Sequence, residues 1–127
     1  MALAFASGLG HQACAADPHL GVIEYEVSCL PCHGIDGRGD GPVGKSLKSK
    51  PADLTQISRR NRGQFPYQSV INIIDGRTLA GSHTDRDMPV WGDRYRSTAP
   101  SQSDEWDRRV RAQIAALAKY IETLQEK

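Results

Sequence analysis

The sequence predicts a small all-α protein, and three observations support this fold class. The chain has 127 residues, enough for one domain with a single core. Apolar side chains in residues 104–124 recur at three- and four-residue steps, which is the spacing of one buried helix face. Two further stretches, residues 18–30 and 66–75, carry helix start signals. No segment convincingly shows the polar and apolar alternation of a half-buried strand.

The first helix is expected over residues 18–30. Asp17 is a good N-cap residue, because its carboxylate can accept a hydrogen bond from the first turn. Pro18 fits the first helical position, where its missing N–H costs nothing. Residues 22–29 continue without a helix breaker. This helix therefore runs into a pair of cysteines.

The middle of the chain predicts one short helix between irregular segments. Residues 34–44 are too rich in glycine for regular structure, and residues 43–48 have room for one or two turns. A second helix is expected over residues 66–75, with Pro66 at its start and Gly76 just after its end.

The C-terminal part predicts a loop followed by the strongest helix. Residues 78–103 are polar and include two prolines, so we expect a loop there. The last helix is expected over residues 104–124, with the apolar face Trp106, Val110, Ile114, Leu117, Ile121 and Leu124. Three main helices joined by loops this long are unusual in a compact domain. A cofactor that the loops wrap would account for them.

The first 16 residues differ from the rest, because they contain no Lys, Arg, Asp or Glu. Their short apolar run and the small residues around Cys14 resemble the later part of a secretory signal peptide. We therefore expect residues 1–16 to be a signal-peptide remnant and residues 17–127 to be the functional domain. Export, and hence a periplasmic location, is the expectation. The run is too short to span a bilayer, so no stable membrane insertion is expected.

Cys29-Leu30-Pro31-Cys32-His33 is a C-x-x-C-H motif, the attachment signature of c-type haem. Thiols at this spacing can each form a thioether with one vinyl group of the same haem. The neighbouring imidazole then reaches the iron as the proximal ligand. The motif predicts one covalently bound haem c, held through Cys29 and Cys32 and ligated by His33.

Other interpretations of the cysteines and glycines are weaker. A zinc site would need further ligands at suitable spacing, and a thioredoxin-like dithiol would need a βαβ setting. Residues 39–46 match G-x-x-x-x-G-K-S, the phosphate-binding P-loop, but no buried strand precedes them. We expect no nucleotide. The net charge of +1 gives no reason to expect nucleic acid either.

A proximal histidine leaves one axial position on the iron. Met88 is the favoured distal ligand, since a thioether is a soft donor and Pro89 would stiffen its loop. His83 lies in a polar setting and His19 at the start of the first helix, so both are expected at the surface. The alternative is that the Met88 side chain only fills space in the apolar core.

Together these motifs resemble the class I c-type cytochrome family over about residues 17–124. Besides the haem motif, Gly21 and Tyr25 match the small and aromatic pair of its first helix, and Leu117 and Tyr120 resemble their partners on the last helix. The resemblance implies a small cytochrome c fold, in which three main helices and long loops surround one haem. It also implies that the first and last helices cross closely.

Three further residues are expected at the cofactor, one of them, Pro42, from the resemblance. Pro42 resembles the proline whose carbonyl accepts a hydrogen bond from the proximal histidine Nδ1. Leu54 is expected to pack on the haem. Trp91 is expected to donate a hydrogen bond to a propionate, with ordinary core packing as the alternative.

The function that follows is an exported monohaem cytochrome that carries one electron between redox partner proteins. Such a carrier makes no bond to a substrate, so it is not an enzyme and has no catalytic residues. The alternative is a haem c electron-transfer subunit of a periplasmic dehydrogenase or of a sulfur-oxidising complex. A ligand-binding cytochrome, in which Met88 is displaced, is a third hypothesis.

Overall fold

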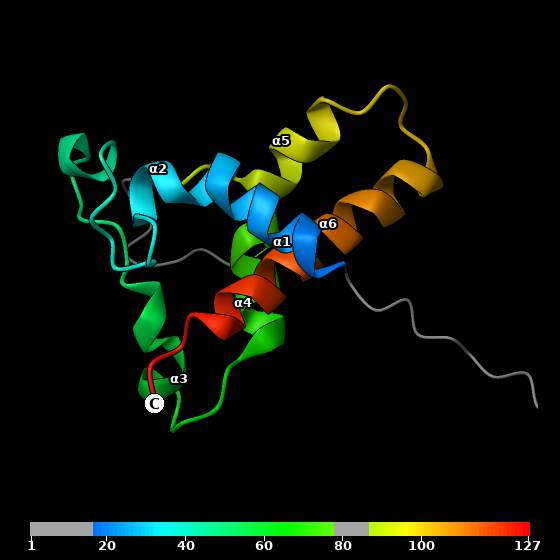
Figure 1. Ribbon diagram of the computed structural model, residues 1–127. Helices are drawn as coiled ribbons and strands as arrows, with labels where there is room; N and C mark the ends of the chain where they lie inside the picture. Colours follow the sequence, from blue (N-terminus) through cyan, green and yellow to red (C-terminus); the bar gives the residue numbers. More distant parts are fainter. Residues whose placement is uncertain (1–16, 78–86) are drawn as a thin grey trace, which may run out of the picture.

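The computed structural model describes residues 17–77 and 87–127, and this part of the chain is all-α (Figure 1). Helices and turns account for its regular structure, and the described residues contain no strand. The predicted fold class is therefore confirmed at this level. The expected signal-peptide remnant, residues 1–16, lies outside the described residues.

The first helical segment continues from Pro18 to His33 in three parts. Helix α1 (Pro18–Glu24) passes into a π-helical turn, η1 (Tyr25–Cys29), and then into α2 (Leu30–His33). The Asp17 carboxylate accepts a hydrogen bond from the His19 backbone N–H at 2.9 Å, as expected of an N-cap. The segment therefore extends three residues past the predicted end, so that both cysteines and the histidine are helical.

Helix α1 crosses the long C-terminal helix α6 (Asp104–Thr123) at very close range (Figure 1). A Cβ atom added to Gly21 would overlap the carbonyl oxygen of Ala116 and lie 3.1 Å from Cβ of Tyr120. The rings of Tyr25 and Tyr120 meet beside this point, with centroids 5.0 Å apart. The close crossing expected at Gly21 is present.

Helix α4 (Tyr67–Asp75) packs on the other side of α6 and completes the core. It begins one residue later than predicted, with Pro66 as the N-cap, and Gly76 ends it in the left-handed conformation at φ 83°. The Tyr67 hydroxyl donates to the Ala115 carbonyl at 3.0 Å. The buried apolar side chains are Tyr25, Cys29, Val70, Ile74, Val110, Ile114, Leu117, Ala118 and Ile121.

The prediction of a loop over residues 78–103 is wrong in part, because residues 91–97 form helix α5 (Trp91–Ser97). Its apolar pattern is only one turn long: the rings of Trp91 and Tyr95 lie 5.9 Å apart and pack against the core. Such a short pattern inside a polar segment gives almost no periodic signal. Contacts with other helices stabilise α5, and those contacts cannot be read from its own residues.

Shorter helices lie in the connections. The 3₁₀ turn η2 (Gly44–Ser46) falls within the one or two turns expected for residues 43–48. The 3₁₀ turn η3 (Leu54–Gln56) and helix α3 (Ile57–Arg60) were not expected. The Asp53 carboxylate accepts hydrogen bonds from the backbone N–H and the hydroxyl of Thr55, at 2.9 and 2.6 Å. These bonds lower the pKa of Asp53.

Arg62, just after α3, has a φ of 56°, which side chains other than glycine rarely adopt. We expect Arg62→Gly to raise the free energy of unfolding by about 1 kcal/mol, because glycine adopts this conformation without strain. Arg59→Gly, inside α3, should lower the free energy of unfolding, since glycine is a poor helix residue. Urea unfolding of both variants tests this. A loss of stability in Arg62→Gly would contradict it.

None of the helices in the described ranges has the length and apolar character that crossing a membrane requires.

Candidate functional site

The three residues of the sequence motif lie on consecutive helical turns. Cys29 closes η1, and Cys32 and His33 belong to α2. Both thiols are free; Cys29 is 5% exposed and His33 7% exposed, whereas Cys32 is half-buried. The structure thus presents two unpaired sulfur atoms and one imidazole on a single short stretch of backbone.

The π-helical turn fixes how this stretch enters the core. The Leu30 N–H donates to the Tyr25 carbonyl, five residues back, in place of the usual four. The buried Tyr25 hydroxyl donates to the Gly34 carbonyl at 2.7 Å, so one side chain spans the whole motif. Single π turns inside α-helices are frequent at functional sites.

The glycine-rich loop that follows is folded back onto α2. Its backbone N–H groups donate to the last carbonyls of the helix: Gly39 to His33 at 2.7 Å, Gly41 to Cys32 at 3.1 Å and Val43 to Pro31 at 2.8 Å. These carbonyls have no partner within the helix. The loop therefore caps α2 and holds the backbone of Cys32 and His33 in place.

His33 is held in one tautomer. Its Nδ1 lies 2.9 Å from the Ala52 carbonyl oxygen, and because a carbonyl can only accept, Nδ1 carries the proton. Burial favours the neutral ring and lowers the pKa of His33 below its usual value, while the hydrogen bond to the Ala52 carbonyl acts in the opposite direction. The unprotonated Nε2 is then the nitrogen available to a metal.

The expected hydrogen-bond partner of His33 was wrong, because Ala52 and not Pro42 supplies the carbonyl. Pro42 is exposed, and the next residue is tied to α2 through Pro31. A backbone carbonyl exists at every position, so no side chain marks Ala52 in the sequence. The available signal is indirect: Pro51 restricts the chain on one side of Ala52, and the Asp53 cap fixes it on the other.

Cys29 is chemically quiet in the folded chain. Burial raises the pKa of its thiol to about 12, with smaller contributions from Glu24 and Cys32. A thiol rather than a thiolate is a poor nucleophile and a poor metal ligand. In the folded chain its side chain belongs to the apolar core, together with Tyr25 and aliphatic side chains of α4 and α6.

The predicted distal ligand, Met88, lies in the half-buried segment just before α5. Its neighbour Asp87 accepts a hydrogen bond from the Ser49 backbone N–H at 3.2 Å. Ser49 belongs to the same connection as Ala52, so one loop is tied to the segment of Met88 and to the imidazole of His33. His83 lies outside the described residues, and His19 is exposed.

Leu54 and Trp91 sit at the edge of the core. The Leu54 N–H donates to the Gly37 carbonyl at 2.7 Å, and its half-buried side chain packs on the core. Trp91 begins α5, and the guanidinium of Arg94 lies 5.3 Å from the centre of its ring. Their expected contacts with a haem stay predictions.

The structure also bears on the P-loop match and on the alternative of a metal site. Residues 39–46 follow helix α2 and end in the turn η2, whereas a P-loop joins a strand to a helix. Within residues 17–77 and 87–127, no three His, Cys, Asp or Glu side chains are grouped so as to hold a metal ion.

The residues fit a c-type haem by the chemistry of the donor set. Two free thiols lie three residues apart, and the imidazole beside them has its Nδ1 occupied and its Nε2 unprotonated. A hydrogen bond to the far nitrogen is the usual support of a metal-bound histidine. Comparison with protein-family models, with curated proteins and with solved structures gave no match.

Proposed function

We propose that this protein is an exported monohaem c-type cytochrome, of the class I family, that carries one electron between redox partner proteins. The observation that carries the proposal is His33: it follows a C-x-x-C pair of free thiols, and the Ala52 carbonyl fixes its tautomer. Among C-x-x-C sites, the adjacent histidine is specific to haem attachment. The N-terminal segment, residues 1–16, supports export by its composition.

In this proposal each residue has a limited task. Cys29 and Cys32 would hold the haem through thioether bonds, and His33 Nε2 and the Met88 sulfur would ligate its iron. The haem supplies a one-electron couple between Fe(III) and Fe(II). The burial of Cys29 and His33 limits the access of water to these side chains, and the Ala52 hydrogen bond keeps the imidazole oriented. An iron ligated by two side chains of the chain would have no position left for a substrate, which favours a carrier over an enzyme.

The test is the absorption spectrum of the protein produced in a host that attaches c-type haem. We expect haem that stays with the polypeptide on a denaturing gel and the weak red-edge band of methionine sulfur on Fe(III). That band should vanish in Met88→Ala and persist in the matched variant His83→Ala. Attached haem without this band in the wild type, or a band that persists in Met88→Ala, would contradict the ligand assignment.

The absence of covalent haem in the wild type would overturn the proposal. Isolation of the native protein distinguishes a free electron carrier from the alternative, a subunit of an enzyme complex. A monomer that exchanges electrons with more than one partner fits a carrier, whereas a stable complex with a catalytic chain fits the enzyme subunit.

A further inference from the structure

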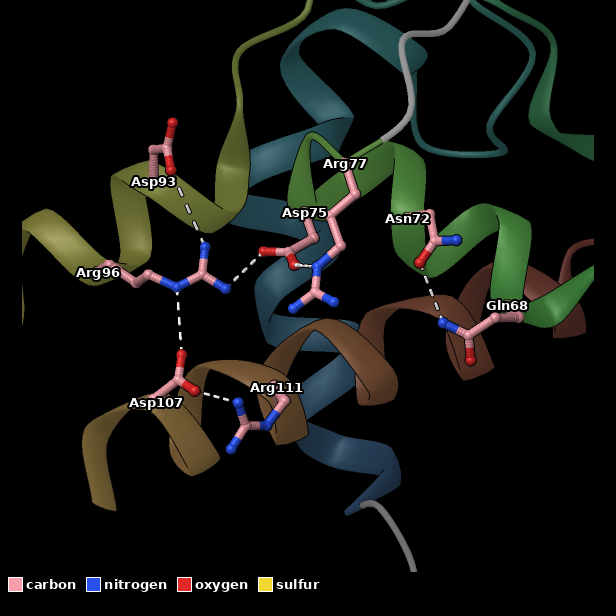
Figure 2. A network of polar contacts seen from close by, with 8 residues as sticks. All are labelled: Gln68, Asn72, Asp75, Arg77, Asp93, Arg96, Asp107 and Arg111. Carbon is pink, nitrogen blue, oxygen red and sulfur yellow. Dashed lines mark hydrogen bonds and ion pairs between the residues drawn. The ribbon is translucent and has the colours of Figure 1, made fainter. Parts of the chain in front are cut away.

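Helix α5 begins three residues after Met88. Polar contacts join it to α4 and α6 (Figure 2), and a hydrogen bond joins it to η1. Met88 itself lies in a stretch without regular structure. Whatever holds the start of α5 therefore also limits where the Met88 sulfur can lie. Two side chains of α5, Tyr95 and Arg96, make the contacts that matter here.

Arg96 joins three helices through their carboxylates. Its Nη2 forms an ion pair with Asp75 Oδ1, at the end of α4, at 2.8 Å, and its Nε donates to Asp107 Oδ1, on α6, at 3.3 Å. The Asp75 side chain is only 5% exposed, and its other oxygen accepts from Arg77 Nε at 2.7 Å. Removing one partner of a buried carboxylate costs far more than breaking a pair on the open surface, because the buried charge loses compensation that water cannot replace.

The backbone of α5 lies directly against the end of α4. A Cβ atom on Gly92 would stand 2.7 Å from the Asp75 carbonyl oxygen and overlap the Asp75 carboxylate. A Cβ atom on Gly76 would overlap the side chain of Val90, two residues after Met88. The chain from Val90 to Gly92 is thus packed without free space against the end of α4.

Tyr95 connects α5 to the segment that carries the cysteines. Its hydroxyl donates to Ser28 Oγ at 3.0 Å, and Ser28 is 7% exposed and immediately precedes Cys29. The hydrogen bond therefore joins the helix that follows the proposed distal ligand to the helical segment Pro18–His33, which ends at the proximal ligand. Its two residues lie far apart in the sequence, so it fixes the spacing between these elements.

We infer that Arg96 and Tyr95 are positioning residues for Met88: they hold α5 so that the Met88 sulfur stays on the iron. This inference rests on the proposed function. Neither residue is a ligand. Their removal should loosen α5 and raise the fraction of molecules in which Met88 has left the iron, while the haem stays attached through Cys29 and Cys32.

Cyanide titration of the oxidised, haem-loaded protein measures that fraction. An added ligand binds only where the sixth position is open, so its apparent affinity is proportional to the open fraction. We expect about tenfold tighter cyanide binding in Arg96→Gln and about threefold in Tyr95→Phe, since removing one partner of a buried ion pair generally costs more than losing one neutral hydrogen bond. The red-edge band should also weaken in both variants.

Two matched variants control for general loss of stability. Arg109→Gln breaks an ion pair of similar length, 2.7 Å to Glu105, that lies within α6 alone. Tyr67→Phe breaks a 3.0 Å tyrosine hydrogen bond that joins α4 to α6 and does not involve α5. Both should bind cyanide like the wild type, with all titrations made well below the lowest unfolding midpoint.

The outcomes separate the inference from the function on which it rests. Tighter binding in Tyr95→Phe but not in Tyr67→Phe supports the inference even where Arg96→Gln fails to fold. Equal affinities in Tyr95→Phe, Tyr67→Phe and a wild type that shows the methionine band would overturn the inference and leave the proposed function standing. A wild type with attached haem and no methionine band would overturn the ligand assignment and the inference together.

Discussion

Replacing Gly21 by alanine is expected to lower the free energy of unfolding by about 3 kcal/mol, the upper end of the usual cost of overpacking. The added methyl group would overlap the Ala116 carbonyl and press on Tyr120. A carbonyl in the middle of α6 cannot rotate away, so the two helices have to separate. Their separation would disrupt the contact between the Tyr25 and Tyr120 rings, whose centroids lie 5.0 Å apart.

The test of Gly21→Ala is decisive because the two explanations predict opposite signs. Close helix packing predicts a lower free energy of unfolding, whereas helix propensity alone predicts a higher one. Glycine to alanine inside a helix normally stabilises by about 1 kcal/mol. Ser69→Ala, at an exposed position of α4, should show such a gain, of a few tenths of a kcal/mol. Denaturant unfolding of Gly21→Ala, Gly21→Val and Ser69→Ala would settle the matter. A stabilised Gly21→Ala would mean that the helices do not cross as closely as described.

Replacing Gly41 by alanine is expected to cost at least about 3 kcal/mol and to impair haem attachment. Its Cβ atom would lie 2.5 Å from the Pro31 carbonyl oxygen, 2.6 Å from that of Leu30 and 2.7 Å from the carbonyl carbon of Cys32. All three are backbone atoms of α2, so the loop has to move away. The move would remove the hydrogen bonds by which the loop caps the helix of Cys32 and His33.

Gly63→Ala is the matched control for Gly41→Ala. Gly63 has a φ of 81°, so alanine would be strained there, but its Cβ atom would meet no other atom within 4 Å. We expect a cost of about 1 kcal/mol and normal haem content. Haem per polypeptide and the unfolding midpoint are the two readouts. Equal losses in both variants would show that backbone strain, and not the contact with α2, determines the effect.

The sequence predicts those elements whose own residues carry a long periodic signal. Helix α6 follows its apolar pattern over its whole length, and α4 lies between Pro66 and Gly76 as expected. Helix α5 has one turn of pattern and depends on Asp75 and Asp107 of other helices, so no local signal could reveal it. The π turn is equally hidden, since residues 25–29 read as an ordinary helix.

The candidate site shows the same contrast between features with a local sequence signal and features that depend on distant contacts. The cysteines and His33 form a motif with fixed spacing, so the sequence is sufficient to group them. The partner of the His33 imidazole is the Ala52 carbonyl on a distant loop, and a backbone carbonyl carries no side-chain signature. The family resemblance points to Pro42 instead. The link between Tyr95 and Ser28 depends on how α5 docks, which only the folded chain shows.

The burial of Cys29 sets an order on the biogenesis of this protein. In the folded chain its thiol is 5% exposed, its pKa is raised to about 12, and it shares one apolar cluster with side chains of α6. The thioether bonds that we propose must therefore form before α6, which is synthesised after every other described element, docks on α1. Haem attachment would then have to be faster than the docking of α6 on α1. A chain in which α6 docks first would bury the Cys29 thiol before the haem is attached.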